Sequence, residues 1–214
     1  ILSGGLPSTI SVKRMGAADT DLYLLDSNSG NIIRLYKTTN AYQYTIDATF
    51  QCGPSAVTSL QLTPLIDLAP LPPGSYENAT VLGMDANGVL LYCGPDSEAV
   101  AVQLPVPDTG TAKLTRFSLN SSVLYLMDVG NMRVLRYLGD TEQKFEYEPV
   151  LYFGSVPPRM DDVVSMAVHM DELYMLRAGQ LLRVDDFDDA GLQLMTGTVG
   201  KDLAIGFINR TDYD

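Results

Sequence analysis

Residues 122–137 read SVLYLMDVGNMRVLRY, two apolar runs on either side of a turn that contains Gly130 and Asn131. Glycine and asparagine tolerate the positive φ angles that tight turns require. The runs on either side are rich in Leu, Val and Tyr, which suit a half-buried strand. This stretch therefore predicts a β-hairpin.

The same strand, turn, strand pattern occurs three more times along the chain. The matching stretches are residues 21–36 (DLYLLDSNSGNIIRLY), 80–93 (TVLGMDANGVLLYC) and 172–184 (ELYMLRAGQLLRV). Alignment at Asp26, Asp85, Asp128 and Arg177 gives spacings of 59, 43 and 49 residues. That spacing suits one four-stranded unit per repeat.

Each hairpin lies between two further β-like runs. The preceding runs are residues 9–15, 65–71, 114–119 and 163–170, and the following runs are residues 42–50, 98–106, 148–156 and 192–199. No stretch keeps a helical period of apolar residues over three turns, so helix should be scarce. We predict an all-β chain that forms a β-propeller of four-stranded antiparallel blades, a single domain over residues 1–214, with repeats at about 9–50, 65–106, 114–156 and 163–199. A β-sandwich, the structural alternative, gives no reason for one hairpin to recur four times.

Residues 202–208, DLAIGFI, repeat the pattern of a first strand and predict an extra strand, the first of a fifth blade. An open arc of blades exposes an apolar flank at each end, and such a flank must be covered. Either four blades close on themselves, with 202–208 completing the first sheet, or the chain is a fragment of a larger propeller. Both alternatives stay open, and in the second the remaining blades are partners of this chain.

The third repeat resembles the NHL type of propeller repeat through Asp128, Gly130, Asn131 and Arg133. The first repeat keeps Asp26 in looser register and the second keeps Asp85. We expect these turn residues to be structural, with the carboxylates accepting hydrogen bonds in their own turns. Residues 52–56, 90–110 and 148–168 also resemble the extracytoplasmic propeller regions of bacterial, Chloroflexi-type signalling proteins linked to metal-dependent protein phosphatase or kinase domains. The resemblance implies a sensor or interaction domain without chemistry of its own.

The charge and hydropathy of the chain narrow its partners. The sequence holds 26 Asp and Glu against 14 Lys and Arg, a formal charge of −12, which argues against nucleic-acid binding. No apolar run is long enough to span a bilayer as a helix, so direct membrane insertion is not expected.

Two cysteines, Cys52 and Cys93, lie 41 residues apart, and adjacent blades would bring them together. We predict a disulfide, which would stabilise the fold by about 4 kcal/mol on the chain-entropy estimate and would place the protein outside a reducing cytosol. The alternative is two buried free thiols. A metal site is not expected, because the spacing is not that of a CxxC pair.

Catalytic constellations do not stand out. His169 is the single histidine, and nothing similar to a GxSxG motif accompanies it, so acyl-transfer hydrolysis is not expected. The acidic clusters Asp161–Asp162 and 185–189 are most simply solvated loops; the alternatives are a weak cation site or a carboxylate pair in a glycan hydrolase or lyase. No cofactor and no metal are predicted.

The leading hypothesis is a non-catalytic extracytoplasmic binding or sensor propeller, located outside the cell or on its surface, whose loops recognise a protein or a small ligand. The alternative is a structural building block of a surface or filament assembly that uses exposed blade flanks as contacts, so oligomers are possible in either case. Sequons at Asn78, Asn120 and Asn209 matter only in a glycosylating secretory pathway.

Overall fold

The computed structural model describes residues 6–37, 43–71, 76–139, 144–154, 159–170, 172–177, 179–184 and 192–198. These residues form sixteen strands and one short 3-10 helix, η1 (Tyr76–Asn78). The all-β prediction is therefore confirmed. The strands are β1 (Val12–Ala18), β2 (Asp21–Asp26), β3 (Ile32–Lys37), β4 (Tyr44–Ile46), β5 (Leu65–Pro70), β6 (Val81–Asp85), β7 (Val89–Gly94), β8 (Ser97–Gln103), β9 (Leu114–Asn120), β10 (Val123–Asp128), β11 (Arg133–Leu138), β12 (Val150–Leu151), β13 (Val163–His169), β14 (Glu172–Arg177), β15 (Gly179–Val184) and β16 (Leu192–Thr198).

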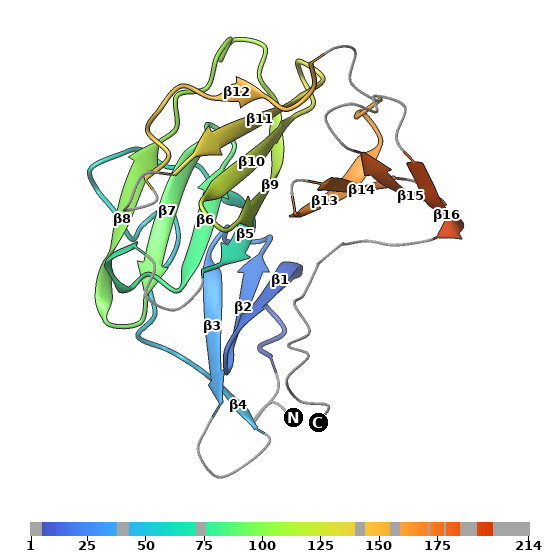
Figure 1. Ribbon diagram of the computed structural model, residues 1–214. Coiled ribbons are helices and arrows are strands. Elements are labelled where there is room, and N and C mark those ends of the chain that lie inside the picture. The colour runs from blue at the N-terminus through green and yellow to red at the C-terminus, as the bar shows by residue number, and fades with distance from the viewer. Residues whose placement is uncertain are drawn as a thin grey trace, which may run out of the picture.

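The strands make four antiparallel sheets, each built from four consecutive strands: β1–β4, β5–β8, β9–β12 and β13–β16. We call these sheets blades 1 to 4. The first strands lie beside one another, since β1 contacts β5, β5 contacts β9, and β9 contacts β13 (Figure 1). Four radially arranged meanders of this kind are a four-bladed β-propeller, as the repeats predicted. Among the described residues, no helix has the length and hydropathy needed to cross a membrane.

Tight turns join the first two strands in three of the blades. Two residues separate β1 from β2, β9 from β10, and β13 from β14. The first residue of each turn, Asp19, Ser121 or Met170, has a φ between 49° and 53°, the sign required by the turns that match the twist of a hairpin. The second turn of blades 1 and 2 uses glycine instead, with Gly30 at φ 70° and Gly88 at φ 79°.

Apolar side chains pack between neighbouring blades. One cluster joins blades 1 and 2 and includes Tyr23, Leu25 and Ile32 against Val81 and Leu91. A second joins blades 2 and 3, and a third joins blades 3 and 4. The aromatic residues that recur in the hairpins, such as Tyr92, Tyr125 and Tyr137, are buried in these clusters.

The fourth strand of blade 3 was expected over 148–156, yet β12 holds only Val150 and Leu151. Tyr152 and Phe153, which follow it, are both buried in the cluster between blades 3 and 4. Among the described residues, the first sheet takes all four of its strands from the first repeat. Residues 202–208 themselves lie outside the described residues, as do Asn209 and the acidic cluster 185–189.

Candidate functional site

Asp85 fixes the second hairpin turn to the segment that leads into the same blade. It ends β6 and is fully buried. Its carboxylate accepts hydrogen bonds from the backbone N–H groups of Asn87 and Val89, both at 2.9 Å, and from the N–H and hydroxyl of Thr63, at 3.0 and 3.1 Å. One carboxylate thus satisfies donors from two loops that lie far apart in sequence.

Asp26 plays the same part in blade 1. It accepts from the N–H of Ser11 at 2.8 Å, just before β1, and from the hydroxyl of Ser29 at 2.7 Å in its own turn. Burial by itself raises the pKa of Asp26, but the hydrogen bonds from Ser29, Ser11 and Asn28 outweigh burial, and the pKa lies below its usual value. The carboxylate form is therefore the one that holds the two loops together.

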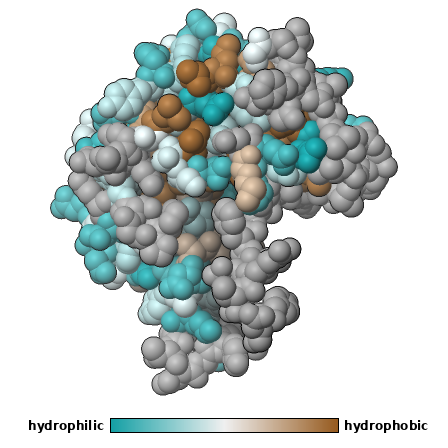
Figure 2. All heavy atoms as spheres, viewed as in Figure 1, coloured by the Kyte–Doolittle hydropathy of each residue, from teal (hydrophilic) through white to brown (hydrophobic). Residues whose placement is uncertain are grey.

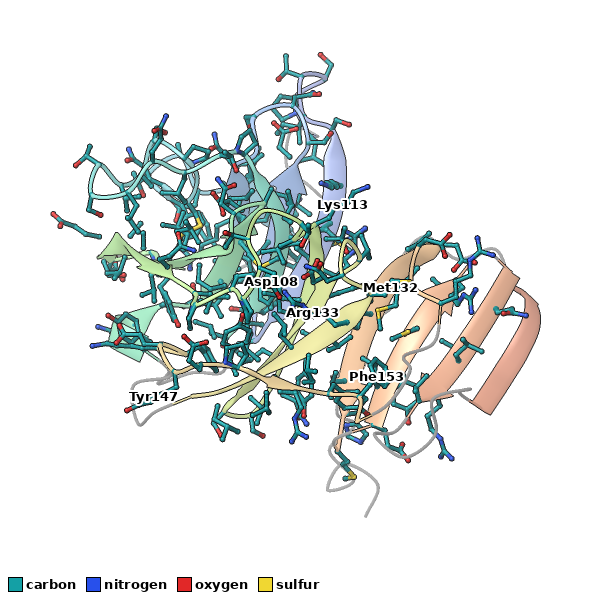
Figure 3. The ribbon with its side chains drawn as sticks, turned by 90° about the horizontal axis from the view of Figure 1, so that it is seen from above. Asp108, Lys113, Met132, Arg133, Tyr147 and Phe153 are labelled. Atoms are coloured by element: carbon teal, nitrogen blue, oxygen red, sulfur yellow. A yellow bond between two sulfur atoms is a disulfide. The ribbon has the colours of Figure 1, made fainter. Side chains whose placement is uncertain are left out.

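Asp128 anchors the third turn together with the other residues of the NHL-like motif. Its carboxylate accepts from the N–H of Lys113 at 2.8 Å, from the side chain of Asn131 at 2.7 Å and from Arg133 at 2.9 Å. Arg133 also donates to Asp108 at 3.1 Å, in the segment between blades 2 and 3, and Figure 3 shows these two side chains next to each other. These contacts join the turn of the NHL-like motif to the segment that precedes β9, and the structural role of the motif stays a prediction.

Blade 4 uses the opposite polarity at the same position. Arg177 ends β14 where the other blades have aspartate, and its guanidinium donates to both oxygens of Asp162, at 2.8 and 3.0 Å. Asp162 directly precedes β13. In this blade the donor therefore lies at the end of the second strand and the acceptor lies in the leading segment, the reverse of the other three blades. Each of the four blades therefore has a polar clamp between its second strand and the segment that leads into its first strand.

These clamps lie on one face of the propeller. In each blade the end of the second strand pairs with the start of the first, as in Val12 with Asp26. We call this side the turn face: it carries turns 27–31, 86–88 and 129–132 and leading segments 9–11, 61–64 and 107–113. Its exposed residues include Asn28, Asn87, Lys113 and Met132.

Polar residues meet at the axis of the propeller, where the four first strands come together. Arg14 of β1 forms an ion pair with Asp67 of β5 at 3.3 Å and donates to the carbonyl of Val164 in β13 at 3.2 Å. The second oxygen of Asp67 accepts from the N–H of Phe117 in β9 at 2.9 Å. Arg116 of β9 then donates to the same Val164 carbonyl at 3.0 Å.

These contacts form a closed circuit, from β1 to β5 to β9 to β13 and back to β1. Arg14 and Asp67 are both more than nine-tenths buried. A buried ion pair is retained only where geometry and further hydrogen bonds satisfy both charges, and here each partner has a second contact. We call these residues the axial circuit: Arg14, Asp67, Arg116, Phe117 and Val164.

Sequence reasoning missed the axial circuit. All four first strands carry an irregularity near their start, after which Arg14, Asp67, Arg116 and Ser165 occupy matching positions opposite Leu25, Met84, Met127 and Leu176. In blades 1, 3 and 4 this residue lies 12 positions before the aspartate or arginine that ends the second strand. Asp67 lies 18 positions before Asp85, because the connection from β5 to β6 is longer. If the alignment of the repeats had been extended to the first strands, it would have placed Arg14, Arg116 and Ser165 at one equivalent position.

Cys52 and Cys93 form a disulfide, as predicted. The bond ties the segment between blades 1 and 2 to β7, the third strand of blade 2. The carbonyl of Cys52 also accepts from the N–H of Ile32 at 2.7 Å, so the segment is held on both neighbouring blades. Crosslinking this loop removes conformational freedom from the unfolded chain.

Other residues singled out in the sequence are not gathered into one site. His169 ends β13 opposite Glu172, Asp161 forms an ion pair with the exposed Arg159, and Asp162 is engaged by Arg177. Asn78 is exposed in η1, and Asn120 ends β9. Among the described residues, no three His, Cys, Asp or Glu side chains are grouped so as to hold a metal ion.

An apolar surface lies over blade 3. Leu138, Val150 and Leu151 are between 55% and 60% exposed, and Tyr147 beside them is 65% exposed. Figure 2 shows apolar atoms reaching the surface in this upper part of the molecule. The surface lies along the outer edge of the blade, since β12 is the last strand of its sheet.

No protein-family model matches the chain, and no curated protein matches it in sequence. Among solved structures it is similar to a catalytically inactive virginiamycin B lyase from Staphylococcus aureus with quinupristin, with TM-score 0.54 and 11% identity over 90% of this chain and 58% of that one. It is also similar to the extracellular domain of a putative one-component system from B. thetaiotaomicron, with TM-score 0.52 and 14% identity over 88% of this chain and 24% of that one. The fold is shared. The chain spans less than two thirds of the length of either protein. At identities this low, the similarity shows a shared β-propeller fold and no shared function.

Proposed function

We propose that this protein is a non-catalytic propeller that acts outside the cytosol and recognises a partner protein through its turn face. The observation that carries the proposal is the set of polar clamps around Asp26, Asp85, Asp128 and Arg177. The clamps at Asp26, Asp85 and Asp128 each fix an exposed turn to a leading segment, so these loops are ordered before a partner arrives. A preordered surface loses less conformational entropy on binding.

The location rests on the Cys52–Cys93 disulfide, because structural disulfides persist in oxidising compartments. One of the similar structures is an extracellular domain, which agrees with this location. The resemblance to propeller regions of bacterial signalling proteins supports a role as a sensor or interaction domain. Alkylation of free thiols in intact cells tests the location: labelling of Cys52 or Cys93 without prior reduction would overturn it.

The recognition face is tested by two matched pairs of substitutions. Asn87→Arg with Met132→Arg adds two charges to the turn face, and Thr20→Arg with Ser122→Arg adds two charges to exposed turns at the opposite end of blades 1 and 3. A protein crosslinked to the wild type in its native setting should be retained by the second variant and lost by the first. Loss in both variants, or in neither, contradicts the proposal.

The non-catalytic part has its own test. Incubation with a panel of polysaccharides at high protein concentration should release no reducing ends and no unsaturated products. Reproducible release that disappears after substitution of a carboxylate in this chain would show a hydrolase or lyase instead.

A further inference from the structure

The axial circuit holds two guanidinium groups close together. Nη2 of Arg14 and Nε of Arg116 both donate to the carbonyl oxygen of Val164, at 3.2 and 3.0 Å. Within the circuit, Asp67 supplies a single carboxylate, which pairs with Arg14 at 3.3 Å and also accepts from the N–H of Phe117. The circuit therefore contains one more positive charge than negative charges. Like charges at this separation repel each other, so a further anion beside them would stabilise the pair.

Both guanidinium groups fold back toward the turn face. Nη1 of Arg14 donates to the carbonyl of Lys13 at 3.1 Å, and Nη1 of Arg116 donates to the carbonyl of Thr115 at 2.6 Å. Each acceptor belongs to the preceding residue of the same strand, and β1 and β9 both begin at the turn face. We call this region the axial end of the turn face: Lys13, Arg14, Lys113, Thr115 and Arg116.

Two exposed lysines add to the positive charge of the axial end. Lys13 lies at the irregularity near the start of β1, and Lys113 directly precedes β9. Both side chains are exposed, and neither forms an ion pair with a described residue. Blades 1 and 3 lie on opposite sides of the four-bladed arrangement in Figure 1, so the two lysines flank the axis from two directions.

The carboxylates of the turn face do not balance these charges, because they already have partners. Asp26 and Asp85 accept hydrogen bonds within their clamps. The other engaged carboxylates are those of Asp108 and Asp128 with Arg133, and that of Asp162 with Arg177. An unbalanced positive region therefore lies at the axial end of a chain whose formal charge is −12.

Hydrogen-bond donors also remain at the axial end. A guanidinium group has five N–H donors, and Arg116 uses two of them in the contacts above. The hydroxyl of the neighbouring Thr115 is buried and has no hydrogen-bond partner in the described part of the chain. An anion with oxygen acceptors would accept from donors of both kinds.

We propose that the axial end binds a carboxylate group in an acidic segment of the partner protein, with Arg116 as the direct donor and Lys13 and Lys113 on either side. The inference rests on the proposed function, because it names the chemistry that the turn face recognises. Hydrogen bonds from arginine and lysine to a carboxylate are about twice as strong as those between neutral groups. A short acidic segment reaches the axial end alone, whereas a nucleic acid would extend over the acidic remainder of the chain and be repelled.

The test measures binding of short peptides to the purified whole chain. A labelled triglutamate peptide should bind saturably with a Kd below about 1 mM, and a triglutamine peptide should not bind. Lys13→Gln with Lys113→Gln should weaken the binding of triglutamate by about tenfold, because two cations next to the carboxylates are lost.

The matched control removes the same charge far from the turn face. Lys37 ends β3 and Lys144 follows β11, and both of these strands run away from the turn face. Lys37→Gln with Lys144→Gln should weaken the binding of triglutamate by less than about twofold, because charges beyond a Debye length are screened. Thermal unfolding of each variant checks that its fold is retained.

Three outcomes overturn the proposal. They are a triglutamate peptide that does not bind the wild type, equal weakening in the two pairs of variants, and inorganic phosphate that binds more than about tenfold tighter than triglutamate, which would assign the site to a phosphate group. Because the peptides report on the axial end alone, their failure leaves the crosslinking result with Asn87→Arg and Met132→Arg intact. The two proposals are therefore tested separately.

Discussion

Arg177 and Asp162 form a two-oxygen ion pair at the position where each of the other blades has a buried aspartate that accepts backbone hydrogen bonds. The exchange preserves the connection between the second strand and the segment before the first strand. It also changes its chemistry, because an arginine can only donate and needs an acceptor across the gap. Asp162, adjacent to the first residue of β13, supplies that acceptor.

Replacement of the two partners should show coupling. In a double-mutant cycle, Arg177→Ala and Asp162→Ala should each destabilise the fold, and the double variant should be less destabilised than the sum by about 1 kcal/mol, the upper range for a partly exposed pair. Urea denaturation gives the free energies of unfolding. Strictly additive effects would show that the pair does not hold the fourth blade.

Asp85→Ala should be more costly than substitution in the blade 4 pair. The change leaves three buried or half-buried N–H groups and one hydroxyl without their acceptor, so we expect the free energy of unfolding to fall by about 3 kcal/mol. Asp96→Ala, at an exposed carboxylate in the next turn of the same blade, is the matched control and should change stability by less than about 0.5 kcal/mol. Equal effects of the two substitutions would contradict the assigned role of Asp85.

The disulfide should contribute substantially to stability. Reduction, or the double change Cys52→Ser with Cys93→Ser, should lower the free energy of unfolding by up to about 4 kcal/mol, because the bond closes a loop with a sequence separation of 41 residues. Thermal unfolding with and without a reductant measures the loss, and the double serine variant should no longer respond to the reductant. A wild type that unfolds at the same temperature in both conditions would be inconsistent with the bond.

Acid should destabilise the protein through Asp26 and Asp47. Burial raises the pKa of Asp47, but Thr49 and Arg34 outweigh burial, and the pKa is lowered, as for Asp26. The unfolded state therefore binds more protons in the acid range, so this stability is complete above about pH 4 and is lost as the pH falls through the folded pKa values. Asp26→Asn should flatten the pH dependence of Tm below about pH 4. An unchanged slope in this variant would exclude Asp26 as a contributor.

The sequence by itself determined the repeat, the strand order within each blade and the sheet class. These follow from local patterns: the alternation of apolar residues, and the turns around Gly30 and Gly88, whose positive φ angles favour glycine. In the third repeat the expectation from Gly130 and Asn131 was wrong in detail, because the positive φ lies at Met132. The disulfide was also accessible, because blades of regular length place Cys52 and Cys93 on neighbouring sheets. The turn aspartates were found as a pattern, although their partners Ser11, Thr63 and Lys113 were not.

Only the tertiary structure decided the axial circuit and the polarity exchange in blade 4. Arg14, Asp67, Arg116 and Val164 lie on four different blades, and a hydrogen bond between residues 14 and 164 leaves no periodic trace in sequence. The irregularity at the start of each first strand shifts register locally, so simple alternation cannot tell which side chain turns toward the axis. Contacts between distant segments depend on how whole sheets pack against one another. Local sequence patterns therefore predicted the blades, whereas the contacts between blades could be seen only in the tertiary structure.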